Sequence, residues 1–473
     1  MPTWDRNRAL DHASLYALVE AETTGTGTDR GIGLEVELFP IRERSLQRVP
    51  LHSAAGILDQ LSASAELHSW LDPEQSISED GWSGGGADGF QISFEPGGQL
   101  EVSGRYQRQM ATALDSMESA TRRLATILAA TGTALAAVGI DQWAPGTVRQ
   151  QRSTLRYPAM DRYFAARGPA GRVMMRDTCA LQLNLDLSSG NEARDRWRVT
   201  NLLAPITTAT FATSPARGGT IRSQRSLTWQ QLDPTRTGFP QHVTDPEVGM
   251  PHQLERYAMD ADVLLTDDGT GNIQPGRPGW RFSDWMSRGH RRLGWPTAAD
   301  FRLHLTTLFP EVRPRGFLEI RSIDALPARW RRVPAVLYAG ATYEPQARDR
   351  ILELLLNRPQ PLEDQLHTAA VGGVSEPAQC ALAVEVWSFA LQGAANLPAG
   401  TFNPGDLELA ERFLDRYTLR GLTPADELAT LLRTSGPMAA LRWAAEPVTT
   451  SMVTSSTTST AANPADSTKG IPR

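Results

Sequence analysis

Residues 33–39, GLEVELF, have the alternation of a β-strand with one polar and one apolar face. Successive side chains of a strand point to opposite faces, so Glu35 and Glu37 share one face and the apolar residues around them share the other. Such alternation is typical of an antiparallel strand whose apolar face covers the core. The stretch therefore predicts a sheet that presents acidic side chains on its other face.

Three other stretches of the chain alternate in the same way. They are QISFEPGGQLEVSG at residues 91–104, CALQLNLDL at 179–187 and FLEIRSID at 317–324. In the first of them, Glu95 stands directly before a Pro-Gly-Gly bend. The polar side chains that share a face within each stretch are Gln99 with Glu101, Gln182 with Asn184 and Asp186, and Glu319 with Arg321.

These polar faces could either lie in water or form a binding site, and their composition distinguishes the two interpretations. For a single strand, a polar face in water is the simpler explanation of the pattern. Water-facing strands usually carry Thr, Ser and Lys, however, whereas these carry Glu, Gln, Asn and Arg. Carboxylates brought together repel one another unless a cation lies between them, and carboxylates with phosphates are usual Mg²⁺ ligands. The faces therefore indicate a site for divalent cations, with arginine available for a carboxylate or a phosphate.

Lysine is almost absent, and its absence excludes several chemistries. One of the 47 basic residues is a lysine, Lys469, and it stands near the C-terminus. A pyridoxal-phosphate enzyme needs a Schiff-base lysine, and the GxxxxGK[ST] loop and the kinase ATP site also need lysine. Any phosphate group must therefore be bound by arginine, metal ions or backbone N–H groups.

Other classes of function lack support in the sequence. The net charge of −6 is unlike that of a general nucleic-acid-binding protein, and the chain has no HExxH, CxxC or GxSxG motif. Its two cysteines, Cys179 and Cys380, fit a reducing compartment. No signal peptide is indicated, and the stretch 124–140 is too short and too mild for a membrane span. We therefore expect a cytoplasmic protein, monomeric or dimeric, without a nucleic-acid or membrane partner.

One large domain followed by a disordered tail is the expected organisation. Residues 1–446 would form the domain, and their last part, from about 345, is predicted to be mostly helical. Thr423, Pro424 and Asp426 form an N-terminal capping pattern for one of its helices. Residues 447–473 are rich in Ser, Thr, Ala and Pro and are predicted to be disordered. Apolar spacing predicts further helices over 106–130, 377–391 and 406–419, and a strand over 134–140.

Together the motifs resemble the glutamate–cysteine ligase family, in its plant and bacterial branch. Residues 92–104, ISFEPGGQLEVSG, are similar to the glutamate-rich EPGGQ signature of that family, and GLEVEL at 33–38 is similar to its first acidic strand. MMRDTCALQLNLD at 174–186 resembles the family's MM-RTC-VQVNLD strand. HLTTLFPEVRPRGFLEIRSID at 304–324 resembles its HLTT-FPEVR motif.

Weaker similarities begin at Arg156, Arg225 and Arg256, and the whole resemblance extends from about residue 31 to 326 in the order of the family. It implies an α+β fold with a curved, mainly antiparallel sheet that forms a funnel with outer helices, like the catalytic domain of glutamine synthetase. It also implies a reaction, in which ATP phosphorylates the γ-carboxylate of L-glutamate and the amine of L-cysteine displaces phosphate. Metal ions and arginines, rather than a protein nucleophile, serve such a transfer.

The resemblance also implies roles for individual residues. Arg321, with Glu319 beside it, would act on the transferring phosphoryl group. Gln182 would complete a metal or nucleotide shell, and Arg225, Arg156 and Tyr257 would hold the substrate glutamate. The glutamates that would bind two or three Mg²⁺ are Glu35, Glu37, Glu95, Glu101 and Glu319.

Several alternatives stay open at this point. A related carboxylate–amine ligase could join glutamate to an amine other than that of cysteine. The dipeptide could feed ergothioneine synthesis, which we favour because arginine- and alanine-rich chains resemble the actinobacterial members of the family, or it could feed glutathione synthesis. More distant alternatives are a non-catalytic regulator that binds metal and nucleotide, or a binding protein that merely exposes polar strands. A regulator of that kind would be expected to lack the acidic set, which is intact here.

Overall fold

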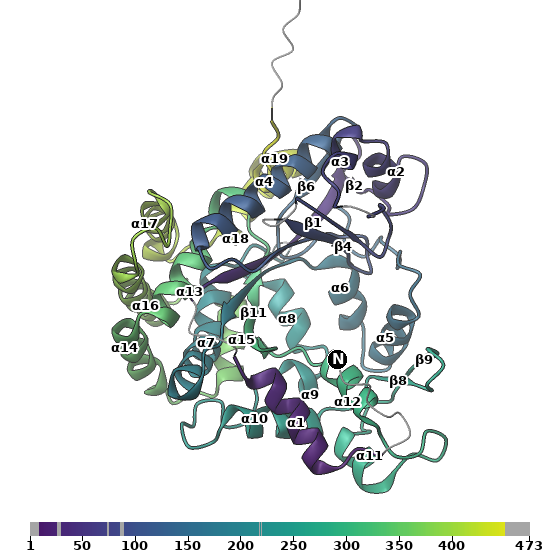
Figure 1. Cartoon of the computed structure of the whole chain (residues 1–473). Coiled ribbons are helices and arrows are strands. Elements are labelled where there is room, and N and C mark those ends of the chain that lie inside the picture. Colours follow the sequence, from purple (N-terminus) through teal and green to yellow (C-terminus); the bar gives the residue numbers. More distant parts are fainter. Residues whose placement is uncertain are drawn as a thin grey trace, which may run out of the picture.

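The strand that carries Glu35 and Glu37 is the centre of the sheet in the computed structural model (Figure 1). This strand, β1, pairs with β7 on one side and with β5 on the other. The sheet continues through β11 to the edge strand β10 and through β4 to the edge strand β3, and all of these pairings are antiparallel. The bounds are β1 (Ile32–Arg42), β3 (Trp82–Gly84), β4 (Phe90–Phe94), β5 (Leu100–Gly104), β7 (Ala180–Asp186), β10 (Val312–Pro314) and β11 (Phe317–Asp324).

β1 is long enough to pair with two sets of partners. Its first half lies between β5 and β7, whereas Phe39 and the residues after it pair with β6 (Thr133–Ala136) and β2 (Gln47–Arg48). The sheet is open, because β10 and β3 do not meet. The expected fold class, an antiparallel sheet with helices outside, is therefore confirmed, and the sheet does not close into a barrel.

The apolar face of the sheet is buried under helices. Leu34, Val36 and Leu183 are at most 1% exposed, and burial of side chains of this size stabilises the fold by about 1.5–3 kcal/mol each. Figure 1 shows most of these helices above and to the left of β1, with α14, α16 and α17 along the left edge of the view, where they pack against other helices. They are α4 (Met110–Ala129), α7 (Gly190–Thr210), α13 (Val333–Tyr343), α14 (Pro345–Leu356), α15 (Leu362–Gly372), α16 (Pro377–Asn396), α17 (Asp406–Arg416), α18 (Pro424–Thr434) and α19 (Pro437–Ala444).

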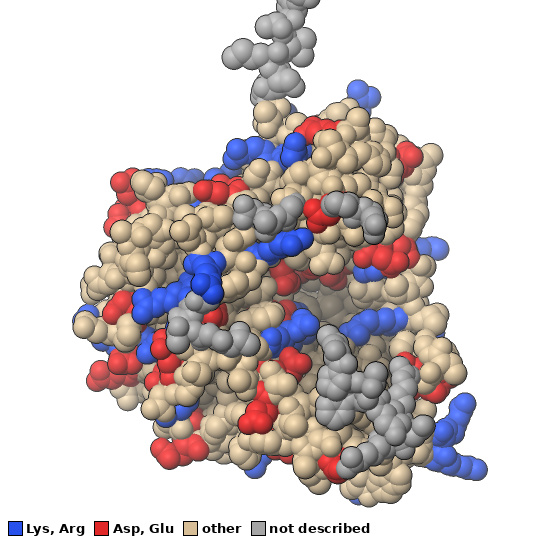
Figure 2. Space-filling view, viewed as in Figure 1, with Lys and Arg blue, Asp and Glu red and all other residues tan. Residues whose placement is uncertain are grey.

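A second group of elements lies on the other side of the sheet (Figure 1). It has its own apolar clusters, one around Phe282 and Phe301 and one around Tyr163 and Phe164. Figure 2 shows the molecule hollowed between the two groups, with acidic side chains inside the hollow and basic side chains along its sides. The second group comprises α1 (His12–Thr23), α5 (Arg156–Ala165), α6 (Ala170–Asp177), α8 (Gln224–Gln230), α9 (Pro234–Thr237), α10 (Met250–Asp260), β8 (Leu265–Asp267), β9 (Ile273–Pro275), α11 (Phe282–Arg288) and α12 (Ala298–Leu305).

The predicted helices are confirmed, with boundaries that differ by a few residues. α4 covers most of 106–130, and α16 and α17 correspond to the predictions at 377–391 and 406–419. The predicted cap of α18 is a capping box in which the Thr423 side chain accepts from the backbone and the Asp426 side chain accepts from Thr423. Two short helices, α2 (Ile57–Ser62) and α3 (Ala65–His68), come between β2 and β3 in the chain.

The structure describes residues 9–25, 30–72, 75–85, 89–216, 218 and 220–449. The predicted disorder of the C-terminal tail falls mainly on 450–473, which lie outside the described residues. No helix within the described ranges has the length and the apolar character needed to cross a membrane.

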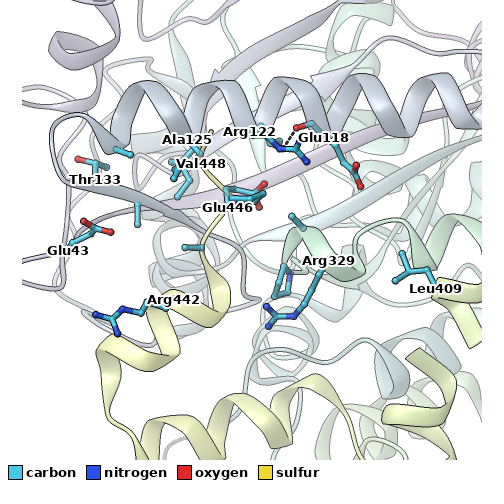
Figure 3. Close-up of a pocket in the computed structure, with 18 residues that line it drawn as sticks. Glu43, Glu118, Arg122, Ala125, Thr133, Arg329, Leu409, Arg442, Glu446 and Val448 are labelled. Carbon is cyan, nitrogen blue, oxygen red and sulfur yellow. Dashed lines mark hydrogen bonds between the residues drawn. The ribbon is translucent and has the colours of Figure 1, made fainter. Parts of the chain in front are cut away.

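A buried ion pair attaches the end of the described chain to the segment that precedes α13. The Arg331 guanidinium donates to both carboxylate oxygens of Glu446, and its Nη1 also donates to Thr121 of α4. Both charged side chains are at most 1% exposed. Glu446 lines a cavity of about 680 Å³ beneath α4 (Figure 3). Losing one partner of such a pair leaves a buried charge without compensation.

Glu446→Gln should therefore lower the free energy of unfolding by about 3–5 kcal/mol, because the Arg331 charge would stay buried. Urea unfolding followed by circular dichroism measures this change. Glu66→Gln is the matched control, since the Arg123–Glu66 pair is exposed and such pairs contribute about 1 kcal/mol or less. Equal losses in the two variants would show that the buried pair contributes no more than a surface pair.

Candidate active site

Three glutamates from neighbouring segments meet on the polar face of the sheet. Glu37 of β1 lies directly opposite Glu101 of β5 in the strand register. Glu95 follows β4, and one carboxylate oxygen from each of these glutamates lies within 4.8 Å of the others. All three side chains are half-buried. The structure therefore brings three of the five predicted glutamates, Glu37, Glu95 and Glu101, together as an acidic cluster, whereas Glu35 and Glu319 lie outside that group.

The bend after Glu95 is held by contacts that tolerate only glycine. A Cβ on Gly97 would lie 2.5 Å from the Arg176 carbonyl oxygen, and Gly98 has φ +77°. The Gly97 carbonyl oxygen accepts from the Arg48 guanidinium at 2.9 Å and from the Gln151 side chain at 2.7 Å. Fixed contacts on both sides of the bend thus set the position of Glu95 relative to β1.

A second group of charges lies toward β10. The Glu319 carboxylate accepts from Arg313 Nε at 2.5 Å and from Arg313 Nη2 at 2.7 Å. Arg321 Nη1 donates to the same carboxylate at 2.8 Å and to Gln182 Oε1 at 2.8 Å. Arg313 and Glu319 are cross-strand partners between β10 and β11. Glu319, for which the resemblance implies a metal-binding role, is therefore paired with two arginines.

The Gln182 side chain of β7 connects the two groups, and Asn184 of the same strand binds Glu35. Gln182 Nε2 donates to Glu37 at 3.2 Å, while its oxygen accepts from Arg321. Asn184 Nδ2 donates to Glu35 at 2.9 Å. Gln182 thus lies between the acidic cluster and Arg321.

Burial and mutual repulsion set the charge state of the cluster. Burial, followed by the charge of Glu101, raises the pKa of Glu37 to about 7. Burial and the charge of Glu37 raise the pKa of Glu95 to about 7, and burial with Glu95 raises that of Glu101 to about 8. Burial opposes ionisation of Glu319 too, but Arg313 and Arg321 lower its pKa to about 2. Three carboxylates thus resist ionisation beside one that is fully ionised.

A divalent cation bound by the acidic cluster would offset the repulsion between its ionised carboxylates. Half-buried carboxylate oxygens within 4.8 Å of one another can share one hard cation. Ionised carboxylates so close together need positive charge between them. Mg²⁺ keeps several water or phosphate ligands of its own, which suits a set of three protein ligands. The residues present therefore fit a magnesium site.

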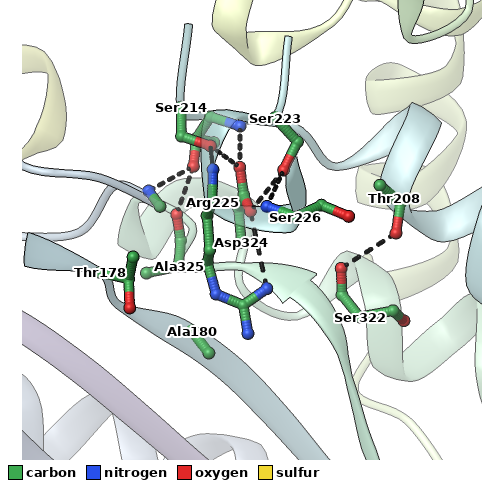
Figure 4. A network of polar contacts seen from close by, with 12 residues as sticks. Thr178, Ala180, Thr208, Ser214, Ser223, Arg225, Ser226, Ser322, Asp324 and Ala325 are labelled. Atoms are coloured by element: carbon green, nitrogen blue, oxygen red, sulfur yellow. Dashed lines mark hydrogen bonds and ion pairs between the residues drawn. The ribbon is translucent and has the colours of Figure 1, made fainter. Parts of the chain in front are cut away.

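Arg225 points toward the sheet from a buried polar network (Figure 4). Asp324 accepts from the Thr213 backbone at 2.9 Å, from Ser214 Oγ at 2.6 Å and from Ser223 Oγ at 3.0 Å. Arg225 Nη1 lies 3.7 Å from the same carboxylate, and its Nη2 donates to the Arg321 carbonyl oxygen at 2.9 Å. The network places Arg225 beside the strand that carries Arg321.

The other two predicted substrate residues come from α5 and α10. Arg156 donates to the side chain and backbone oxygens of Thr306 at 3.0 and 3.1 Å. Tyr257 of α10 is buried, and its hydroxyl has no hydrogen-bond partner among the described residues. Arg156 and Arg225 therefore approach the sheet from different segments, α5 and α8.

Several residues of the site were missed by sequence reasoning. Arg313 stands in the quoted FPEVRPRG stretch, two residues before the turn into β11, and only the register shows that it faces Glu319. Arg152 comes from a loop, donates to the Phe94 carbonyl oxygen at 2.9 Å and helps to lower the pKa of Glu95. Trp229 and Phe309 flank the Arg321 guanidinium, at 5.5 and 5.8 Å from the ring centres. No periodic pattern marks a loop arginine or an aromatic neighbour of this kind.

Cys179 and His304, which stand in the quoted motifs, are both buried. Cys179 is fully buried in the core, and His304 is buried with its Nε2 2.8 Å from the Ala258 carbonyl oxygen. Both lie outside the acidic cluster.

Comparison with known proteins identifies the family. Residues 31–383 match the profile of glutamate–cysteine ligase family 2. The chain belongs to this family. It is 30% identical to the glutamate–cysteine ligase EgtA of Mycolicibacterium smegmatis, over 88% of this chain and 97% of that protein. It is 29% identical to the chloroplastic glutamate–cysteine ligase A of Oryza sativa subsp. japonica, over 85% of this chain and 81% of that one.

The glutamate–cysteine ligase of Francisella tularensis, solved in complex with AMP, has a TM-score of 0.44 and 10% identity to this chain, covering 89% of this chain and 88% of that one. The family match includes every strand of the main sheet and the acidic cluster, and it ends within α16. The protein is therefore an enzyme of the ligase class, and the part that matches the family includes its whole main sheet.

The charge state of the cluster predicts how Mg²⁺ binding depends on pH. A cation needs ionised carboxylates, and the pKa values of Glu37, Glu95 and Glu101 are about 7, 7 and 8. Mg²⁺ affinity should therefore rise from pH 6 to pH 8.5, as measured by isothermal titration calorimetry. Because these pKa values lie above the unfolded value of about 4.3, stability without divalent ions should fall as pH rises from about 5 to 8.

Thermal unfolding in EDTA tests the second half of this prediction. The melting temperature should fall over that range, and Mg²⁺ should restore it most at the alkaline end. Glu101→Gln is the control, since a neutral side chain should flatten both pH profiles. Affinity for Mg²⁺ that is constant across this range would contradict the assignment of the cluster as a metal site.

Proposed function

We propose that this enzyme joins the γ-carboxylate of L-glutamate to the amine of L-cysteine at the expense of ATP. The family and the names of the two relatives support this reaction. The observation that carries it is the acidic cluster with Arg321 beside it on one sheet face. Phosphoryl transfer between two anions needs positive charge at fixed positions and no covalent help from the protein.

The proposed reaction has two steps. A γ-carboxylate oxygen of glutamate attacks the γ-phosphorus of ATP, and ADP leaves with the electron pair of the broken P–O bond. The cysteine amine then attacks the acyl carbon, phosphate leaves, and the nitrogen loses a proton. The products are γ-glutamylcysteine, ADP and phosphate.

Glu37, Glu95 and Glu101 would hold Mg²⁺, and Glu35 and Glu319 would extend this set. Bound Mg²⁺ supplies positive charge that offsets the charge of the nucleotide phosphates. The lack of lysine outside the tail is consistent with such a site, because arginine and metal ions remain to meet the phosphates. The number of ions, two or three, stays a prediction.

Arg321 would orient the phosphoryl group as it is transferred. Glu319 and Gln182 fix one end of its guanidinium, and Trp229 and Phe309 flank it. A guanidinium held in this way presents a planar fork that matches two phosphate oxygens. Arg225, oriented by Asp324, would bind a carboxylate of glutamate with Arg156 and Tyr257.

Phosphate release from ATP tests the proposal directly. We expect release to require glutamate, Mg²⁺ and cysteine together, and γ-glutamylcysteine should accumulate as the product. A panel of other amines tests the alternative acceptor, and a faster rate with one of them would favour it. No release with any amine would overturn the proposed function.

The pathway is a separate proposal. We propose that the dipeptide feeds ergothioneine synthesis, which the 30% identity to a mycobacterial relative supports, and glutathione synthesis is the alternative. Deletion of the gene should remove ergothioneine from cell extracts while other thiols persist. Loss of glutathione instead would favour the alternative.

Arg321→Lys should lower kcat at least about 100-fold, because a point charge replaces a planar bidentate fork. The KM for cysteine should change little, and steady-state phosphate release measures both. Arg123→Lys is the control, since this arginine is exposed on α4. An unchanged kcat in Arg321→Lys would remove Arg321 from the phosphoryl role.

A further inference from the structure

The cavity beneath α4 lies on the helix-covered side of the sheet, away from the polar face that carries the acidic cluster (Figure 3). Its volume of about 680 Å³ is within the usual range for small-molecule sites. Its walls come from α4, β6, α17, α19 and the segments 327–329 and 445–448. The described lining contains none of the residues proposed to bind metal, nucleotide or glutamate, so the cavity is separate from the active site.

More than half of the residues that line this cavity are apolar. Ala125 and Ala129 of α4 face Ala134 and Leu135 of β6 across it, and Leu409 of α17 adds a further apolar side chain. The alanines carry no atoms beyond Cβ, which leaves space between the elements. Covering apolar walls with the apolar part of a ligand removes them from water and favours binding.

Two of the three carboxylates at the cavity are already paired with arginines outside its lining. Arg331 donates to both oxygens of Glu446, and Arg332 Nη1 lies 3.6 Å from Glu118 Oε2. The third carboxylate, Glu43, is exposed and directly follows β1. Glu446 and Glu118 therefore add little uncompensated negative charge to the cavity.

The arginines of the lining are not compensated in this way. Arg329 and Arg442 lie on the side of the cavity away from α4 (Figure 3). Neither forms an ion pair with another residue of the described chain. The Arg329 guanidinium lies 4.8 Å from the ring centre of Trp443, and this contact restricts its movement. The cavity thus combines an apolar wall with guanidinium groups that are available to a ligand.

We propose that this cavity binds a small organic anion, a carboxylate on an aliphatic or aromatic body, with its charge at Arg329 and Arg442 and its body against α4 and β6. Guanidinium groups form charge-assisted hydrogen bonds with carboxylates. Inorganic phosphate would suit the arginines but would leave the apolar wall uncovered. The assignment does not depend on the proposed ligation reaction, because it uses no residue of that site.

Displacement of a fluorescent apolar anion, 1-anilinonaphthalene-8-sulfonate, from the full-length protein tests the proposal. We expect octanoate to displace one dye molecule per chain. 1-Octanol has the same body without the charge, and it should compete at least about 10-fold less well, the usual effect of losing a hydrogen bond to a charged group. A parallel titration with 1-naphthoate shows whether an aliphatic or an aromatic body is preferred.

Substitutions in the lining locate the bound anion. Ala129→Trp should abolish displaceable binding by filling the cavity from an exposed position on α4. Arg442→Ala should weaken octanoate binding about 10-fold, whereas Glu43→Gln should leave it as tight or tighter, because a negative charge is removed. Arg412→Ala is the matched control, since Arg412 is an exposed arginine of α17 outside the lining. Melting temperatures show that each variant is folded.

Four results would overturn the assignment. They are the absence of dye displaceable by octanoate, equal competition by octanoate and 1-octanol, octanoate binding that is unchanged in either Ala129→Trp or Arg442→Ala, and weaker binding in Glu43→Gln. Saturating ATP, glutamate and Mg²⁺ should leave the dye bound. Displacement of the dye by these substrates would place it in the active site and would likewise contradict a separate cavity.

Discussion

Repulsion between glutamates crowded on one sheet face is the constraint on which the site depends. Glu37, Glu95 and Glu101 lie within 4.8 Å of one another and are shielded from water, so their pKa values rise. In a medium of low dielectric constant such charges must be protonated or neutralised. The rest of the structure must therefore hold these glutamates in place. A bound cation would offset the repulsion between them.

The fold holds the cluster through the apolar side of the same strands. The strands bury alternate residues on the side where α4 packs against β1 and β5 and α7 packs against β11, and a register shift of one residue would exchange the two faces. Burial of the leucines therefore fixes which way the glutamates point. The bend at Gly97 and Gly98 adds Glu95, which no strand carries, and its contacts with Arg48 and Gln151 keep that side chain at the cluster.

Arginines pair with the carboxylates that lie beside the acidic cluster. Arg321 lies between the acidic cluster and the ionised Glu319, while Arg225 is oriented by Asp324. Arg313 contacts Glu319 from the edge strand β10. The acidic cluster, Gln182 and Glu319 with its two arginines thus lie along one polar face of the sheet.

The sequence alone determined the four alternating strand segments, their polar faces, the helices α4, α16, α17 and α18, and the placing of Glu37 and Glu101 on those faces. It could do so because alternation is a local property of extended backbone, and the capping box of α18 is local as well. Tertiary structure alone decided that Arg313 faces Glu319 and that Arg152 approaches Glu95. It also decided that Arg329 and Arg442 line one cavity with α4. These arrangements join residues far apart in the chain, so they follow from strand register and from the packing of α4 and α19 against β6, which no local pattern records.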